Sequence, residues 1–434
     1  MNIVRHSDPN YEARIQGLTG GSSLLDPVIQ ERTEGILREV AQSGDAALVA
    51  LTQRFDGATL TPDRLAVTKA ERMNAALAAD EALRKAIQTS SRNIEAFSRK
   101  SKRRGWSARN AQGATVGEKF DPFQRVGVYI PGGTAPLAST ALMTVLLAKV
   151  AGCPEIVVCT PCQKDGTINP ALLYATSVAG ATEIYRIGGA QAIAAMAYGT
   201  STIRPVSKVF GPGNAYVVAA KRLLFGRVAV DLLPGPSEVL VVADDSANPR
   251  WIAADLLAQA EHGSGHERVW LATPSARILK GVERELRAQI PTLKRREFIE
   301  KALAANGWLI QVKNLDAAIG LANLLAPEHC EIMTRKPQQV AARIVTAGAL
   351  FLGGTSPTVL GDYVAGPSHT LPTGGAGASF AGLTVDQFQR RTSVVQYTAA
   401  ALKKSVPTTG HEHPAPPRRQ TARPSGPIFT RLPR

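Results

Sequence analysis

Residues 125–160 have the sequence RVGVYIPGGTAPLASTALMTVLLAKVAGCPEIVVCT, in which two short β-branched runs flank a longer stretch rich in alanine and leucine. The two runs are Val126–Ile130 and Ile156–Cys159, and similar runs follow at Glu183–Ile187 and Lys208–Phe210. Alanine-rich stretches of helical length separate them. This alternation is typical of a parallel sheet whose strands are connected by crossover helices.

A second series of strands with the same design follows. Its β-branched runs, again separated by helical patterns, are Val239–Ala243, Val269–Ala272, Trp308–Val312, Glu331–Met333 and Ala349–Leu352. We therefore predict an α/β fold with two Rossmann-like parallel-sheet domains. Ligand sites in such sheets are expected beyond the carboxyl ends of the strands.

The N-terminal part is predicted to be helical. Asp26-Pro27 joins an N-cap residue to a proline at the first helical position, and Gly44 would end that helix. A further helical stretch runs roughly from Glu71 to Arg99. We predict four parts: an N-terminal segment (1–25), a first α/β domain (26–126 with 237–380), a second α/β domain (127–236) and a C-terminal extension (381–434).

Composition indicates a cytoplasmic globular protein. Apolar residues make up 44% of the chain, no apolar run reaches the ~18 residues of a membrane span, and Met1–Asn10 lacks the apolar region of a signal peptide. Four cysteines are too few for a disulfide framework in a chain of 434 residues. We interpret Cys159-Thr-Pro-Cys162 as part of an apolar turn with inert thiols, although a redox pair has the same spacing.

The formal net charge of +15 is concentrated in two segments. Arg99–Arg109 contains six basic and no acidic residues, and Lys403–Arg434 contains seven basic residues and only Glu412. No motif with interleaved aromatic residues accompanies either segment. We therefore interpret both as solvated surface and expect no nucleic-acid partner.

Two pairs of polar residues stand at the ends of predicted elements. Gln259 and His262 are three residues apart at the end of a predicted helix, so both could reach one metal ion; the same pattern also fits a plain polar helix end. Glu328 and His329 adjoin each other in a predicted loop. They offer two proton-transfer groups of different intrinsic pKa, or else a solvated loop pair.

Long glycine-containing segments follow several strands. The segment GDYVAGPSHTLPTGG, residues 361–375, carries Asp362 and His369, which are candidates for metal or substrate binding or else parts of a mobile surface loop. Three shorter turns, at Gly132, Gly189 and Gly211–Gly213, stand where backbone N–H groups could face a phosphate. None matches G-x-G-x-x-G, so each turn alone is weak support for a nucleotide site.

Taken together, these segments resemble the histidinol dehydrogenase family. The resemblance covers residues 15–400 and includes SGDAALVALTQRFDG. The other stretches, in the family's order, are VGVYIPGGTAPLAS, RIGGAQAIAAMAYGT, VFGPGNAYV, DLLPGPSEVLVVADDSANP, AADLLAQAEH, LAPEHCE and GDYVAGPSHTLPTGG. The resemblance implies a cytoplasmic homodimer that oxidises L-histidinol through the aldehyde to L-histidine, the last step of histidine biosynthesis, and reduces two NAD.

The resemblance also implies a zinc site and two catalytic residues. Gln259, His262 and Asp362 would hold one zinc ion per subunit and would also contact the substrate. His329 would act as the base on the alcohol, and Glu328 would activate water against the bound aldehyde. These residues would lie in the first α/β domain.

Five further residues receive roles from the same resemblance. Ser237 and His369 would contact the substrate. Tyr129, Gln191 and Asn214 would contact NAD. In the family's homodimer, a C-terminal segment of one subunit completes the site of the other.

The C-terminal end departs from the family pattern. The family's Glu-Gly-Leu-x-x-His type motif, which supplies a substrate-binding glutamate and a fourth zinc ligand, is missing here. Seven of the 28 prolines lie in the last 30 residues, so we expect a disordered tail from about residue 405. His411 and His413 are the remaining imidazoles in this tail, and a shifted reading frame would also account for its composition.

Other functions remain open from sequence alone. A paralogue of the same fold could oxidise another polar alcohol, such as a sulfonated diol, because the missing glutamate would no longer select histidinol. A zinc hydrolase could use Glu328 as its base with His262 and Asp362 as ligands, and would need no NAD. A non-catalytic relic would fail to bind zinc.

Overall fold

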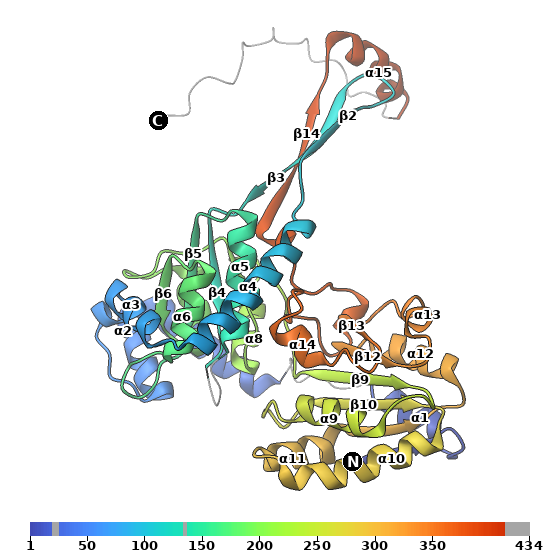
Figure 1. Ribbon diagram of the computed structural model, residues 1–434. Helices are drawn as coiled ribbons and strands as arrows, with labels where there is room; N and C mark the ends of the chain where they lie inside the picture. The colour runs from blue at the N-terminus through green and yellow to red at the C-terminus, as the bar shows by residue number, and fades with distance from the viewer. Residues whose placement is uncertain (20–25, 133–136, 413–434) are drawn as a thin grey trace. The chain divides into compact units, whose positions relative to one another are not determined.

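The computed structural model describes residues 1–19, 26–132 and 137–412. The chain forms two compact units, one from Met1–Lys102 with Pro122–Arg390 and the other from Arg103–Asp121 with the segment that begins at Arg391. The first unit contains two parallel sheets, each covered by helices on both faces (Figure 1). The expected α/β architecture with two Rossmann-like sheets is confirmed.

The larger sheet has six parallel strands in the order β1-β11-β10-β9-β12-β13. The strands are β1 (Asn2–Arg5), β9 (Glu238–Ala243), β10 (Arg268–Thr273), β11 (Gly307–Gln311), β12 (His329–Met333) and β13 (Ala349–Leu352). From β9 the chain adds β10 and β11 on one side and later β12 and β13 on the other. Sequence analysis predicted the last five strands but not β1, which pairs with β11 through Ile3 and Leu309.

Alternate residues of this sheet pack against helices on opposite faces. Val239 and Val241 belong to a core with one helix layer, and Leu240 and Val242 belong to the core on the other side. The helices of this domain are α1 (Tyr11–Gly17), α9 (Pro249–Ala260), α10 (Ala276–Gln289), α11 (Arg296–Asn306), α12 (Leu315–Leu325), α13 (Pro337–Ala341) and α14 (Thr358–Tyr363). Burial of both faces explains why the strands are continuous apolar runs.

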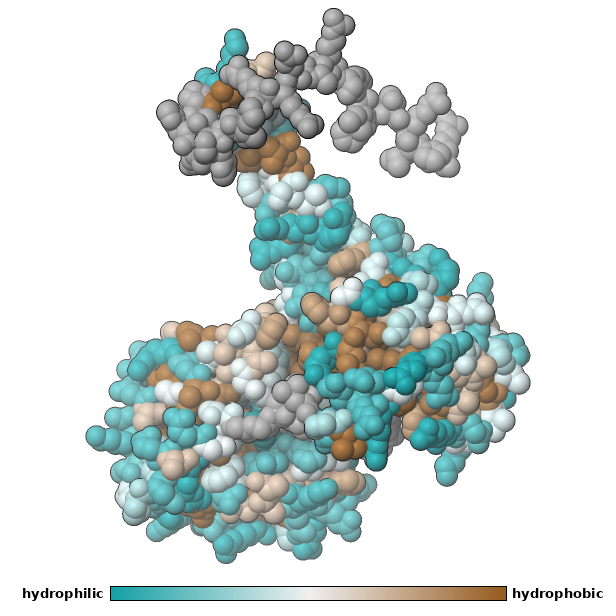
Figure 2. Space-filling model, turned by 180° about the vertical axis from the view of Figure 1, so that it is seen from behind, coloured by the Kyte–Doolittle hydropathy of each residue, from teal (hydrophilic) through white to brown (hydrophobic). Residues whose placement is uncertain are grey.

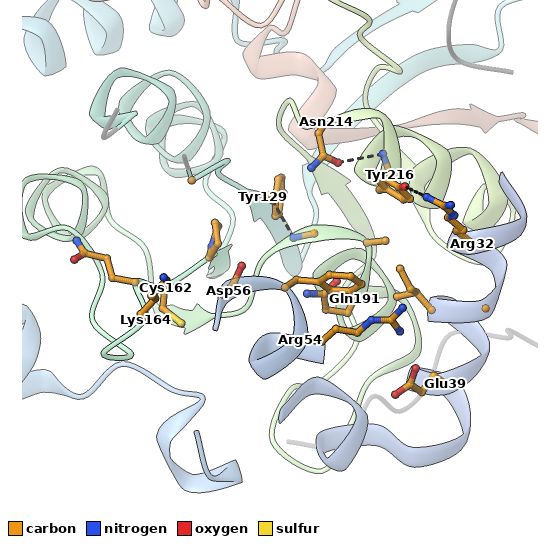
Figure 3. Close-up of a pocket in the computed structure, with 18 of the residues that line it drawn as sticks. Arg32, Glu39, Arg54, Asp56, Tyr129, Cys162, Lys164, Gln191, Asn214 and Tyr216 are labelled. Atoms are coloured by element: carbon orange, nitrogen blue, oxygen red, sulfur yellow. Dashed lines mark hydrogen bonds between the residues drawn. The ribbon is translucent and has the colours of Figure 1, made fainter. Parts of the chain in front are cut away.

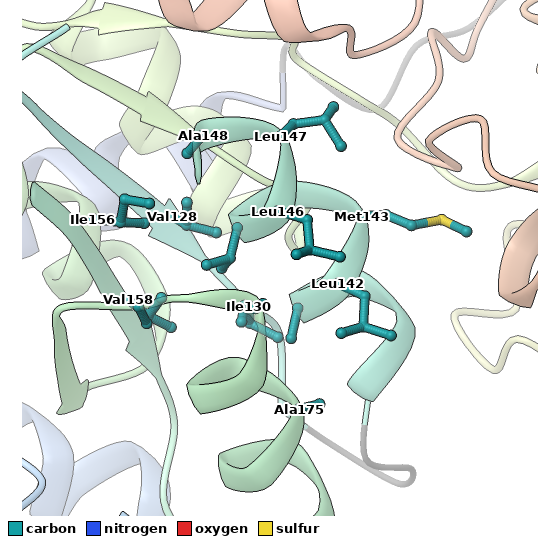
Figure 4. Close-up of a cluster of buried hydrophobic side chains, with 14 of the residues drawn as sticks. Val128, Ile130, Leu142, Met143, Leu146, Leu147, Ala148, Ile156, Val158 and Ala175 are labelled. Atoms are coloured by element: carbon teal, nitrogen blue, oxygen red, sulfur yellow. The ribbon is translucent and has the colours of Figure 1, made fainter. Parts of the chain in front are cut away.

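The smaller sheet has the parallel order β6-β5-β4-β7-β8. Its strands are β4 (Arg125–Tyr129), β5 (Glu155–Thr160), β6 (Glu183–Arg186), β7 (Lys208–Phe210) and β8 (Ala229–Val230). The helices that follow its first four strands are α5 (Ala138–Ala151), α6 (Pro170–Ala179), α7 (Gly189–Tyr198) and α8 (Ala215–Leu224). On one face, Val128 and Ile156 pack against Leu142 and Leu146 of α5 (Figure 4).

The N-terminal helices belong to a different domain from the one expected. They are α2 (Pro27–Asp56), α3 (Lys69–Ala78) and α4 (Glu81–Ser101). Sequence analysis grouped residues 26–126 with the first α/β domain, but α2 packs against α7 and α8, α3 against α6, and α4 against α5. Their apolar residues therefore complete the core of the smaller sheet.

Local signals set the ends of these helices. Asp26 caps α2 through its side chain, which accepts the backbone N–H groups of Val28 and Ile29, and Gly44 interrupts α2 with non-helical φ and ψ angles, as predicted. The single helical stretch predicted from Glu71 to Arg99 is two helices. Ala79 is the C-cap of the first, and Asp80 caps the second by accepting the Leu83 N–H.

The second unit contains an element pattern that the sequence did not predict. Strand β2 (Trp106–Arg109) pairs antiparallel with β3 (Thr115–Pro122), and β14 (Gln389–Gln396) lies on the other side of β3. Helix α15 (Ala399–Glu412) follows. It continues past residue 405, where we expected the disordered tail to begin, because alanine, leucine and lysine at its start favour a helix.

Apolar side chains are exposed on this unit. Val394, Val395 and Tyr397 follow one another along and after β14, and Leu402 lies on α15; each is at least 43% exposed. Figure 2 shows brown surface on this unit. Within the described residues, no helix has both the length and the apolarity that crossing a membrane would require.

Candidate functional site

A cavity of about 1250 Å³ lies at the carboxyl ends of strands β4, β5 and β6 of the smaller sheet. Its wall is built from α2, from the turns after these strands and from the start of α8 (Figure 3). This is the position that the doubly wound fold favours for a ligand. Tyr129, Gln191 and Asn214, the three residues expected to contact NAD, all line it.

Each of these three side chains has a defined position. Tyr129 ends β4, and its hydroxyl accepts the backbone N–H of Gly189 at 3.0 Å. Asn214 caps α8 by accepting the N–H groups of Tyr216 and Val217, both at 3.1 Å. Gln191, in the first turn of α7, is 1% exposed, and neither polar atom of its amide has a hydrogen-bond partner among the described residues.

Glycine is required where the turns of this cavity approach one another. A Cβ atom at Gly132 would lie 2.3 Å from Cγ of Pro161, and one at Gly188 would lie 2.6 Å from Cβ of the same proline. Gly211 has φ of +105°, and its Cβ would lie 2.1 Å from the Tyr129 carbonyl oxygen. The glycine-rich turns therefore bring the backbone close together at the cavity without matching a standard dinucleotide fingerprint.

The second candidate group lies in the larger sheet and is centred on the backbone of Glu238. The Glu238 N–H donates to Oε2 of Glu328 at 2.8 Å, and its carbonyl oxygen lies 3.0 Å from Nδ1 of His329. One residue of β9 thus fixes both residues expected to transfer protons. The prediction that His329 lies in a loop was wrong. It is the first residue of β12, because it pairs with Val239 and Ala349.

The electrostatics of this group follow from burial and from its carboxylates. Burial would lower the pKa of the His329 imidazole, but the negative charges of Glu328 and Asp362 outweigh it and raise the pKa to about 9. Burial raises the pKa of the Glu238 carboxyl to about 7, although Arg268 lies 3.5 Å away. With Nδ1 held by the Glu238 carbonyl, Nε2 of His329 faces Asp362.

Asp362 brings the two histidines of the site together. It lies in α14, and its Oδ1 is 3.8 Å from Nε2 of His329 and 3.8 Å from Nδ1 of His369. Nε2 of His369 lies 3.1 Å from the Thr140 hydroxyl of α5. Burial lowers the pKa of the His369 imidazole, while the Asp362 charge acts in the opposite direction.

Gln259 and His262 lie at the end of α9. Nδ1 of His262 is 3.0 Å from the Gln259 carbonyl oxygen, which leaves Nε2 available as a ligand, and Gln259 is 1% exposed. Among the described residues no three His, Cys, Asp or Glu side chains form a ready metal cluster. A site made of Gln259, His262 and Asp362 would contain only two residues of these types, because its third ligand is a glutamine.

The remaining expected site residues are placed as follows. Ser237 immediately precedes β9, and its carbonyl oxygen accepts the Arg268 N–H. His411 lies in α15, and His413 lies outside the described residues. All four cysteines are free, and burial raises the pKa of the Cys159 thiol to about 12, as expected for an inert residue.

Sequence analysis missed three groups beside these residues. Glu238 is a charged residue inside the apolar run SEVLVVA, a pattern that could have drawn attention to it. Thr140 and Met143 of α5 hold the segment around His369: Met143 Sδ accepts the His369 N–H at 3.3 Å. Nothing in the local sequence of α5 signals that contact, because it joins residues more than 200 positions apart.

Comparison with known proteins gives a consistent result. The sequence profile of the histidinol dehydrogenase family matches residues 23–411. Histidinol dehydrogenase of Geobacillus kaustophilus is 44% identical over 397 residues, which is 90% of this chain and 93% of that protein. The enzyme of the same name from a Synechococcus species is 46% identical over 375 residues, 86% of each chain.

A solved structure agrees with these sequences. The crystal structure of histidinol dehydrogenase from Elizabethkingia anophelis superposes with a TM-score of 0.89 at 35% identity, and covers 95% of this chain and 94% of that chain. Both the sequence and the fold therefore match over nearly the whole length. This chain belongs to the histidinol dehydrogenase family of oxidoreductases.

Proposed function

We propose that this protein oxidises L-histidinol to L-histidine through the aldehyde, as the last step of histidine biosynthesis, with NAD as the oxidant and one zinc ion per subunit. The observation that carries the proposal is the fixed pair of Glu328 and His329 on the backbone of Glu238. Both side chains are at most 8% exposed, and Asp362 faces His329. Two groups that can accept protons in one protected site suit an alcohol oxidation in two stages.

The residues of this chain fit a nicotinamide dinucleotide and a zinc ion. The unpartnered amide of Gln191 and the glycine turns suit a nucleotide in the cavity of the smaller sheet. Gln259, His262 and Asp362 would hold zinc, for which an amide oxygen, an imidazole and a carboxylate are suitable donors. When bound, NAD would accept hydride from the substrate carbon, and zinc would orient the substrate's amino and imidazole nitrogens.

The chain's own residues supply the proton transfers. In the first stage the neutral imidazole of His329, the form that predominates above its pKa of about 9, takes the hydroxyl proton at Nε2, because Nδ1 is occupied by the Glu238 carbonyl. In the second stage Glu328 removes a proton from water as it adds to the aldehyde, and the resulting hydrate loses the second hydride. His369, held by Thr140, and Ser237 would contact the substrate.

Two features support a homodimer. The family's C-terminal segment acts across subunits, and the exposed apolar residues of β14 and α15 offer a surface that a second copy could cover. His411 remains the candidate within α15 for a fourth zinc ligand, with His413 as the other candidate in the tail. Comparing the zinc content of His411→Ala and His413→Ala with that of the wild type would test both.

The test measures NADH formation by absorbance with L-histidinol and NAD, using protein purified with zinc. We expect two NADH per histidinol consumed, and a large loss of rate in His329→Asn and Glu328→Gln. Glu285→Gln, at an exposed ion pair on α10, is the matched control. No NADH from folded, zinc-loaded wild type would refute histidinol as substrate, and a panel of other polar alcohols and ester substrates would then be tested.

A further inference from the structure

Asp56 occupies an electrostatically unfavourable position. It is the last residue of α2, and Gly57 follows it in the left-handed conformation that ends the helix. The carbonyl groups at a helix C-terminus carry partial negative charge, so a carboxylate there is repelled. A carboxylate in this position is explained either by a partner that compensates its charge or by a role in binding a ligand.

The described residues provide little compensation. Oδ2 of Asp56 is buried without a hydrogen-bond partner, and the Cys162 backbone N–H is the donor that acts on its carboxylate. Arg54 and Lys164 line the same cavity as Asp56, yet no ion pair joins Asp56 to either. Burial raises the pKa of the Asp56 carboxyl to about 6, while the Cys162 N–H lowers it.

The location of Asp56 indicates which ligand group it could bind. In dinucleotide-binding folds, an acidic residue after the second strand accepts hydrogen bonds from the adenosine ribose. In the smaller sheet β5 is the second strand, beside β4. The acid in the turn that follows it, Asp165, is exposed and accepts the N–H and hydroxyl of Thr167, and it does not line the cavity. Asp56, from α2, is held against this turn by Cys162 (Figure 3).

We propose that Asp56 selects NAD against NADP by accepting hydrogen bonds from the ribose hydroxyls of the adenosine half of the cofactor. A 2′-phosphate would place two negative charges against the carboxylate and would remove the donor that it binds. The inference rests on the proposed use of a nicotinamide dinucleotide in this cavity. It adds a residue from a different segment of the chain to the three that line the site at the strand ends.

The cations of the cavity make the prediction specific. Arg32, Arg54 and Lys164 also line it, and without Asp56 the carboxylate of Glu39 would be the one acidic side chain among its described lining residues, so positive charge would predominate around a phosphate on the ribose. Removing the carboxylate is therefore expected to weaken the binding of NAD and to strengthen the binding of NADP. If Asp56 had a purely structural role, its replacement would weaken the binding of both cofactors equally.

The experiment compares wild type with Asp56→Asn, which preserves the shape of the side chain, and Asp56→Ser, which leaves room for a phosphate. Dissociation constants for NAD and NADP are measured by calorimetry, and kcat/KM is measured with each cofactor and histidinol. We expect the preference for NAD over NADP to fall at least tenfold in both variants. Asp165→Asn, an exposed carboxylate further along the same turn, should retain the wild-type preference.

The outcomes separate the two proposals. If the wild type reduces NAD and the variants keep the wild-type preference for NAD over NADP, the role of Asp56 is overturned and the proposed function stands. Wild type that binds NAD but does not oxidise histidinol would overturn the proposed function, while the dissociation constants would still test Asp56. Wild type that binds neither nucleotide would overturn both.

Discussion

Lys221 and Asp231 form a fully buried ion pair in the smaller domain, beside Gly211. Both side chains are 0% exposed. Besides Asp231, Nζ of Lys221 donates to the carbonyl oxygens of Gly211 at 2.7 Å and Leu232 at 3.1 Å. Oδ2 of Asp231 in turn accepts the Gly211 N–H at 2.7 Å. The pair therefore holds both backbone groups of the residue that begins the turn to Asn214.

The substitution Lys221→Met keeps the length of the side chain and removes its charge. It leaves the Asp231 carboxylate buried without its cation and leaves two carbonyl groups without their donor. Breaking a buried pair from one side costs about 3–5 kcal/mol in the free energy of unfolding. The double variant Lys221→Met/Asp231→Asn buries no unpaired charge, so we expect it to be more stable than the single variant by at least ~1 kcal/mol.

The assay is urea unfolding followed by circular dichroism, with Lys85→Met, an exposed lysine of α4, as the control. That control should change the free energy of unfolding by less than ~0.5 kcal/mol. NAD affinity should also fall in Lys221→Met because the turn that carries Asn214 loses its anchor. A loss of stability below ~1 kcal/mol, or a double variant no more stable than the single one, would refute the reasoning.

Three further predictions concern the larger sheet and its contacts. Thr140→Val removes the hydroxyl that lies 3.1 Å from His369. One hydrogen bond contributes ~0.5–1.5 kcal/mol, so the KM for histidinol should rise about two- to twelvefold. The KM for NAD should not change and Thr140→Ser should stay close to wild type, and an unchanged histidinol KM would count against the contact. Burial and the adjacent Asp255 carboxyl hold the pKa of Glu331 well above 4.5, so the folded state retains a proton that the unfolded state releases, and stability falls as pH rises above about 4.5. Glu331→Gln does not titrate, and its melting temperature relative to wild type should therefore increase between pH 5 and pH 8; a constant difference would contradict this. Finally, His262→Ala should lose zinc by atomic absorption while His266→Ala, at an exposed residue, retains it, and equal zinc contents would exclude His262 as a ligand.

The sequence was sufficient to predict the elements with strong periodicity. Buried strands such as Val239–Ala243 are continuous apolar runs because helices cover both faces of each sheet. The exposed strand Trp106–Arg109 has no apolar run, since all four of its residues face solvent. The partners of α2 were also beyond local sequence, because its contacts with α7 and α8 depend on how the chain returns after more than 100 residues.

The position of Glu328 and His329, the proposed proton-transfer pair, does not follow the general rule for ligand sites in such folds. The rule places ligands at the carboxyl ends of parallel strands, and the cavity of the smaller sheet follows it. Glu328 and His329 instead lie at the amino end of β12. The ladder between β9 and β12 begins with Val239 opposite His329, so the backbone groups of Glu238, one residue earlier, are free to bind side chains.

Both backbone groups of Glu238 then bind side chains, the N–H that of Glu328 and the carbonyl that of His329. The start of a parallel ladder thus offers an N–H and a carbonyl side by side, much as a helix end offers unpaired groups to a ligand. A sequence pattern cannot show where a ladder begins, because that depends on the register between strands 90 residues apart. It can show the carboxylate that marks the place: a glutamate at the head of an otherwise apolar strand, as in SEVLVVA, is costly to bury and therefore indicates a site.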